Sequence, residues 1–180
     1  MITVLTAVES RDGLLKKTGE EFLRSVKLIE SLDDELYAGA KKSNGSIGAH
    51  FRHNIEIVDN FLYGLKAGKI DYGNRERDIR IEQDRSYAIE RIGYVIDGLH
   101  ELPSEFFHLE VLVRSEIDLD TWHDSSATRE LEFIHSHTVH HHAIIAEKLK
   151  AVGIEVSADF GVAPSTLEFW KRVKNNNDEI

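Results

Sequence analysis

Hydrophobic residues recur every three or four positions in four stretches of the chain, which predicts four long amphipathic helices. The periodic stretches cover residues 14–31, 46–67, 84–101 and 128–151. In the last of them the apolar positions are Leu131, Ile134, Ile144, Ile145 and Leu149. This spacing places the apolar side chains on one face of a helix with 3.6 residues per turn. The pattern therefore predicts an all-α domain.

The period changes between the third and fourth helices. Apolar and polar residues alternate within residues 108–113, which is typical of a strand, and residues 117–122 are the nearest candidate partner. We therefore expect a short β-hairpin here. After the fourth helix, a turn-rich stretch at residues 158–166 precedes a short helix over 167–173 and a polar, frayed tail.

Length and charge narrow the classes of function. A chain of 180 residues with 41% hydrophobic residues can bury one core, and no flexible linker divides it, so we expect a single domain over residues 1–180. The 32 acidic side chains exceed the 22 basic ones, and the resulting charge of -10 repels phosphate backbones. Nucleic acid is therefore not an expected partner.

Neither a membrane segment nor a thiolate site is expected. No apolar run approaches the roughly 20 residues that cross a bilayer, and the first residues do not have the pattern of a signal peptide. We therefore expect a cytoplasmic protein with no membrane partner. The chain has no cysteine, so any zinc-like site must use nitrogen and oxygen ligands.

Five histidines fall within residues 135–142, and their helical phase separates them. His137 and His141 lie four residues apart in the apolar stripe, so both imidazoles can reach one ion. His135 is about 200° from His137 and points elsewhere. We expect His140 and His142 to be flanking or exposed residues, because they lie off the centre of the stripe.

A second pair, His50 and His53, lies in the second helix, where either residue could face the same core. A single inward histidine is commonly a core residue that is hydrogen-bonded to a neighbour. Two pairs on separate helices are harder to satisfy in that way, since burying an unpaired ring costs on the order of 1–3 kcal/mol. The pattern therefore favours a metal site over four structural histidines.

Four separated segments together resemble the DinB-like superfamily. They are residues 46–53 (SIGAHFRH), residues 71–78 (DYGNRERD), residues 129–141, which begin REL and end HTVHH, and residues 160–166 (FGVAPST). The resemblance covers most of the chain, and the order and spacing of the segments make it more specific than any one of them. It implies a four-helix bundle with a long crossover, and a homodimer.

The resemblance also implies a divalent metal held by His53, His137 and His141. His50 remains a reserve candidate, because the alignment could slip by one turn, and His140 is a second reserve ligand or a residue that supports one. Imidazole ligands suit zinc, nickel, copper and iron. Characterised members of the superfamily include thiol-dependent transferases. The implied function is activation of a low-molecular-weight thiol or of water for transfer to a small electrophilic substrate, by an S-transferase or a hydrolase.

Four further residues are candidates for a substrate pocket. Arg52, Arg75 and Arg77 could hold an anionic thiol or a carboxylate, since guanidinium groups bind carboxylates in a bidentate manner. Tyr72 could donate a proton if it reaches the metal. The alternative is that the arginines tie a long loop to the helices and that Tyr72 is a packing residue.

Two other functions stay open at this point. The pairs Glu132/His135 and Glu105/His108 have the Glu-x-x-His spacing of a di-iron carboxylate protein, although Pro103 argues against a helix around the second pair. The other is a non-enzymatic metal-binding or stress-response protein, which the sequence does not distinguish from an enzyme.

Overall fold

The chain is predominantly helical, with one small sheet. The computed structural model describes residues 2–39 and 45–178. Its helices are α1 (Ile2–Ser31), α2 (Asp34–Ala38), α3 (Ile47–Ala67), α4 (Ile79–Gln83), α5 (Arg85–His100), α6 (Ala127–Ala151) and α7 (Pro164–Asp178), with a 3-10 turn at Ser104–His108. The strands are β1 (Lys69–Ile70), β2 (Glu110–Arg114) and β3 (Trp122–Ser126). The expected predominance of helix is confirmed.

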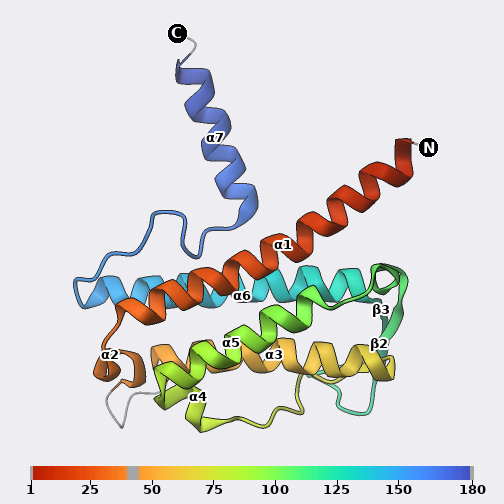
Figure 1. Cartoon of the computed structure of the whole chain (residues 1–180), viewed down its shortest axis with the longest axis horizontal. Helices are drawn as coiled ribbons and strands as arrows, with labels where there is room; N and C mark the ends of the chain where they lie inside the picture. The colour runs from red at the N-terminus through yellow and green to blue at the C-terminus, as the bar shows by residue number, and fades with distance from the viewer. Residues whose placement is uncertain (1, 40–44, 179–180) are drawn as a thin grey trace.

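Four long helices pack around a shared apolar core. Helix α3 contacts α5 and α6, and α1 contacts the same two helices. In Figure 1 the chain directions of α3 and α6 are opposite, and α7 extends away from the rest of the molecule. Phe22 of α1, Phe61 of α3, Ile92 of α5 and Leu131 of α6 are all buried at the centre. The α3 and α6 pair carries the four histidines that the sequence pattern singles out.

The sheet connects the end of α3 with the start of α6. Strands β2 and β3 form an antiparallel hairpin in which Leu112 pairs with Asp124, and β1 adds a parallel strand beside β2. The alternating residues predicted the first strand of this hairpin. The second strand lies later than expected, at Trp122–Ser126, because its polar, largely exposed residues give no alternating signal. Ser126 ends this strand and caps α6 through its side chain, which accepts from the Arg129 amide.

Other element boundaries differ from the sequence expectation. Helix α1 begins at Ile2 rather than near residue 14, because a glycine costs only about 1 kcal/mol inside a helix and Gly13 does not end it. Helix α7 continues to Asp178, through residues expected to be frayed. The short helices α2 and α4 were not predicted, because one or two turns give too few positions for a periodic signal. Among the described residues, no helix is both long and apolar enough to cross a membrane.

A glycine allows α4 to pack closely on α3. A Cβ atom at Gly48 would clash with the backbone of Glu82 and lie 2.8 Å from the Tyr37 ring. The Tyr37 hydroxyl in turn donates to the Ile81 carbonyl at 2.7 Å, inside the core. This close contact fixes the N-terminal part of α3, from which His50 and His53 project.

We predict that Gly48→Ala lowers the free energy of unfolding by about 1–3 kcal/mol, because the backbone of α4 must shift. Gly93→Ala is the matched control, since Gly93 lies in α5 with no atom near its added Cβ. That change should raise stability by up to about 1 kcal/mol. Urea denaturation followed by circular dichroism measures both. Equal effects of the two substitutions would contradict the close packing.

Candidate metal centre

Three imidazoles from two helices meet in one place. His53 of α3 and His137 and His141 of α6 each offer one ring nitrogen, and these nitrogens all lie within 4.8 Å of one another. The ring centroids of the three pairs are 4.7 to 4.9 Å apart. Each residue is partly exposed, so the cluster is open to small molecules at one side. This group is the metal-compatible cluster of the described part of the chain.

The phase of α6 decides which histidines enter the cluster. Its fully buried positions include Leu131, Ile134 and Ile145, whereas His137 and His141 are only half-buried. The two histidines therefore lie at the edge of the apolar stripe rather than within it. Their four-residue spacing still brings the rings to adjacent turns of the same face. Phe133, one turn before His137, packs on its ring with centroids 5.3 Å apart.

His50 supports the cluster from one side. Its Nδ1 lies 2.8 Å from Nδ1 of His141, so one of the two rings donates to the other. The three-histidine group contains His53 rather than His50. His50 occupies one ring nitrogen of His141 and leaves the other for an ion. His140 is exposed, with its ring against that of His141 at 5.4 Å between centroids.

His53 presents opposite edges to two different neighbours. Its Nε2 lies 2.8 Å from Nε2 of His137, within the cluster. Its Nδ1, on the other edge, accepts a hydrogen bond of 3.0 Å from Nη1 of Arg75. An ion at the cluster would therefore be held by Nε2 of His53.

Burial keeps these rings neutral. Desolvation, followed by the nearby Arg75 guanidinium, lowers the pKa of His53 to about 4. Desolvation and the neighbouring histidines lower the pKa of His141 to about 3. The pKa of His137 is also lowered, mainly by burial. Neutral imidazoles are the form that binds metal, so the cluster has its lone pairs available near pH 7.

The donor set fits a divalent transition metal. Three neutral nitrogen ligands leave a tetrahedral ion with one open position, which is the arrangement of catalytic rather than structural zinc sites. The residues that would hold the ion are His53, His137 and His141. Imidazole is a suitable ligand for zinc, nickel, copper and iron, so the ligand type alone does not select one of these metals.

Two further histidines of α6, His135 and His142, face helix α1. His142 was expected to be flanking or exposed, and this prediction was wrong, because its ring is fully buried. Its Nε2 lies 2.8 Å from the Ser25 hydroxyl and its Nδ1 lies 3.2 Å from Glu21, both on α1. The signal that could have placed it is its spacing from Ile145 and Leu149, with which it shares one face.

His135 points away from the cluster, as its phase predicted. It is nevertheless buried, with Nδ1 3.5 Å from the Thr18 hydroxyl of α1 and with no partner for Nε2 among the described residues. The residues of the di-iron alternative do not gather around it. Glu132 is exposed on α6, and Glu105 is exposed in the 3-10 turn. That alternative has no geometric support.

The four residues predicted to line a substrate pocket lie in different surroundings. The side chain of Arg52 forms ion pairs with Glu56 and Glu82, at 3.9 and 3.3 Å, and so ties α4 to α3. The hydroxyl of Tyr72 donates to Glu130 at 2.9 Å inside the protein. Arg77 is exposed, with a positive φ of 56°. Arg75 is the member of this set that contacts the histidine cluster.

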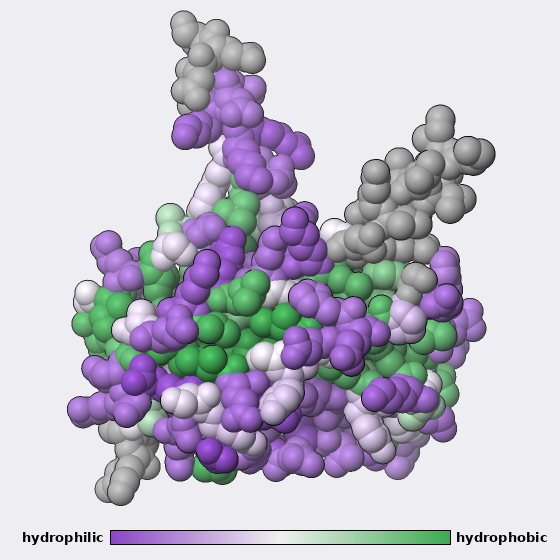
Figure 2. Space-filling model, in the orientation of Figure 1, coloured by the Kyte–Doolittle hydropathy of each residue, from purple (hydrophilic) through white to green (hydrophobic). Residues whose placement is uncertain are grey.

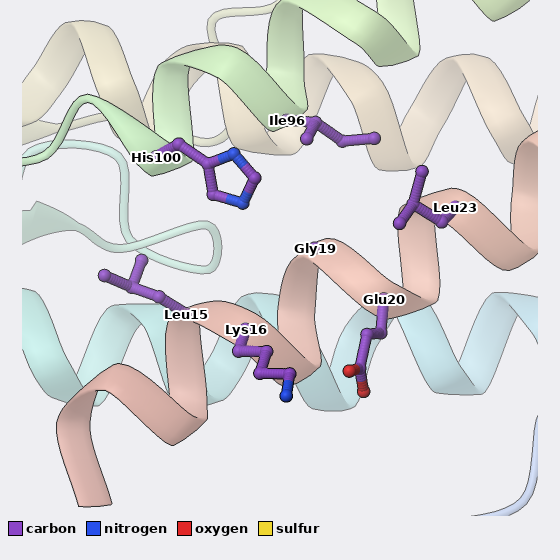
Figure 3. A pocket seen from close by; sticks show the side chains of 7 residues that line it. All are labelled: Leu15, Lys16, Gly19, Glu20, Leu23, Ile96 and His100. Atoms are coloured by element: carbon purple, nitrogen blue, oxygen red, sulfur yellow. The ribbon is translucent and has the colours of Figure 1, made fainter. Parts of the chain in front are cut away.

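A groove on another face of the molecule does not share this chemistry. It lies between α1 and α5, where Figure 3 shows His100 facing Gly19, whereas the side chains of Lys16 and Glu20 point away from His100. Leu15, Leu23 and Ile96 complete its lining. Figure 2 shows that apolar side chains gather along this face. The groove has one histidine and one carboxylate, which is too few for a metal site of the kind formed by α3 and α6.

Comparisons with known proteins give limited information. No family model matches the chain, and no solved structure matches it. A curated protein, FK506-binding protein 5 of Rhizopus delemar, is 33% identical over 107 residues. The match covers 57% of this chain but only 28% of that protein. The chain is thus similar to part of a much longer protein, and this similarity does not establish its family.

We predict that His137→Ala and His141→Ala each abolish binding of a divalent metal, because two imidazoles cannot complete the site. His135→Leu is the matched control: it removes a buried ring whose Nε2 has no described partner, on the same helix but facing α1. This variant should keep the metal and should not be less stable than the original chain. Elemental analysis of untagged protein and thermal melting measure both. Metal loss in His135→Leu would contradict the assignment.

We also predict an unusually acid-resistant metal site. An ordinary imidazole protonates near a pKa of about 6.5, whereas the pKa of His53 in the folded chain is lowered to about 4. Protons therefore begin to compete with metal only as the pH approaches that lowered value. Metal affinity measured by competition with a chelator of known pH dependence should change little around pH 6.5. A steep loss of affinity at that pH would show that the rings are not desolvated.

The same lowered pKa values affect the stability of the metal-free protein. The unfolded chain binds protons on these histidines below pH 6.5, whereas the folded chain does not until about pH 4 for His53. Stability contributed by this site is therefore complete above pH 6.5 and is lost as the pH falls toward 4. The stability loss thus begins near pH 6.5, the pH at which metal binding is measured, and continues below it.

Proposed function

We propose that this chain is a divalent-metal-dependent enzyme of the DinB-like superfamily, with a four-helix bundle that holds one ion on His53, His137 and His141. Its function is to activate a low-molecular-weight thiol or water for transfer to a small electrophilic substrate. The observation that carries the proposal is the convergence of three neutral, partly exposed imidazoles from two helices within 4.8 Å.

Several features favour a catalytic use of this centre over a structural one. A structural zinc site usually has four protein ligands, whereas this one has three and is half-exposed. The core around α3 and α6 is packed with buried aliphatic and aromatic side chains, so the fold does not depend on an ion to bring these helices together. The centre is therefore available for chemistry.

The ion, when bound, would supply Lewis acidity that lowers the pKa of a bound water or thiol toward neutral pH. The residues of the chain would hold the ion and fix the orientation of its ligands. The three histidines hold the ion, His50 orients His141 through their Nδ1 contact, and Phe133 packs against one side of His137. Since the chain has no cysteine, the sulfur nucleophile must come from a cosubstrate.

The resemblance to the DinB-like superfamily supports the reaction class, since its characterised members include thiol-dependent transferases. The geometry of the cluster is consistent with the ligand positions that the resemblance implies. The similarity to FK506-binding protein 5 does not favour a second function, because it spans only 28% of that protein. We therefore do not propose that this chain binds FK506.

We predict that cobalt substituted into the site gives the visible spectrum of a tetrahedral ion, and that a small thiol such as 2-mercaptoethanol changes this spectrum as its sulfur takes the open position. Absorption titration measures the change. His50→Gln should keep the cobalt but bind it several-fold more weakly, since the support of His141 is altered. A cobalt spectrum that no thiol perturbs, with one ion bound per chain, would favour a metal-binding protein without thiol chemistry.

A further inference from the structure

A polar cavity of about 690 Å³ lies next to the histidine cluster. It is formed by α3, the loop at residues 71–78 and α5. Its lining includes Asp59 and Asn60 of α3, Arg75 of the loop, and Tyr87 and Arg91 of α5. Arg75 belongs to both places, because it lines this cavity and also donates to Nδ1 of His53. The cavity therefore reaches the cluster through one side chain.

Within the described part of the chain, Arg91 has an acidic partner at ion-pair distance and Arg75 does not, although Glu56 interacts with Arg75 electrostatically. Arg91 forms an ion pair of 2.7 Å with Asp59. The Arg75 side chain is half-buried. Among the described residues it makes one hydrogen bond, to His53, although a guanidinium has five N–H donors. Its Nε is buried without a partner among the described residues. The remaining N–H groups of Arg75 can therefore donate to an acceptor that enters the cavity.

The bond between Arg75 and His53 is not compatible with a metal on His53. Arg75 can only donate, so Nδ1 of His53 must carry a lone pair in this structure. When Nε2 of a neutral imidazole binds an ion, the proton resides on Nδ1 instead. The proton moves from Nε2 to Nδ1 through solvent, and the ring stays neutral. Two donors, the Nδ1–H of His53 and the Nη1–H of Arg75, would then face each other.

An acceptor placed between these two donors removes the conflict. A carboxylate has two oxygens, one for the Nδ1–H of a histidine and one for a guanidinium. Metal-bound histidines commonly donate their second N–H to a carboxylate. Two nearby carboxylates of the chain lie in other surroundings: Glu56 accepts from the Asp78 amide at 2.8 Å, and Glu76 is exposed to solvent.

We propose that the cavity binds the carboxylate of a small-molecule substrate between Arg75 and His53, and that this binding is coupled to occupation of the metal site. The inference rests on the proposed function, because the coupling requires an ion on His53. A monoanionic carboxylate fits better than a phosphate, because Glu56, Asp59, Glu76 and Asp78 line the same cavity and repel a second negative charge. The substrate class is therefore a small carboxylic acid whose reactive group lies near the metal.

The test uses propionate as the probe and propionamide as its uncharged analogue. Each is titrated into the full chain, zinc-loaded and metal-free, and the Arg Nε–H and His ring signals are followed by nuclear magnetic resonance. Propionate should bind the zinc-loaded protein at least about fivefold more tightly than the metal-free protein, and propionamide should not bind. Arg75→Gln should weaken propionate binding about tenfold, as expected for loss of a charge-assisted hydrogen bond.

Arg77→Gln is the matched control, since it removes the same charge from an exposed side chain of the same loop. It should leave propionate binding unchanged. Propionate that binds equally well to Arg75→Gln, or equally well with and without zinc, would overturn the inference while leaving the metal site intact. Absence of bound zinc in elemental analysis would instead overturn the proposed function itself, so the two failures are distinguishable. If Arg75→Gln does not fold, the Arg75 Nε–H signal of the zinc-loaded wild type decides the outcome, because propionate that binds only to the open position of the ion would leave this signal unchanged.

Discussion

The contact between α3 and α6 is the constraint on which the candidate site depends. It brings His53 to within 2.8 Å of His137 and His50 to within 2.8 Å of His141. Burial lowers the pKa values of all four imidazoles, which favours their neutral form. The short distances between the ring nitrogens make a positive charge on the cluster costly. They also place several nitrogen lone pairs around one point. Three of these residues, His53, His137 and His141, could therefore hold a metal ion.

The histidine run of α6 is divided among three environments by the helical turn. His137 and His141 face α3, His135 and His142 face α1, and His140 faces solvent. The buried ring of His142 is satisfied by Ser25 and Glu21, and Phe160 stacks on it at 4.5 Å between centroids. The loop around Phe160 therefore covers the junction of α1 and α6 rather than the histidine cluster. These contacts fix the rotation of α6 about its axis, and with it the direction of His137 and His141.

The loop at residues 71–78 is anchored near both ends and contacts the histidine cluster from its middle. Asp71 accepts from Arg114 of the sheet at 2.9 Å, and Asp78 caps α4 through its side chain. Between these two anchors, Arg75 reaches His53. The loop is thus held at both ends while its middle supplies the cation beside the cluster. This placement of Arg75 is the basis of the carboxylate site that we propose.

The sequence determined the long helices, the first strand of the hairpin and the spacing that makes a two-histidine face on α6, because these depend on local periodicity. It also indicated His53 as the partner from α3, through the resemblance to a known superfamily. Only the tertiary structure decided which helix covers each face of α6, because α1 packs on one side of that helix and α3 on the other, and local spacing does not name the partner of a face. For the same reason His142, expected at the surface, lies in the core. The partners of Arg52, Tyr72 and Arg75 likewise come from distant segments, so their roles follow from packing and not from the order of residues in the chain.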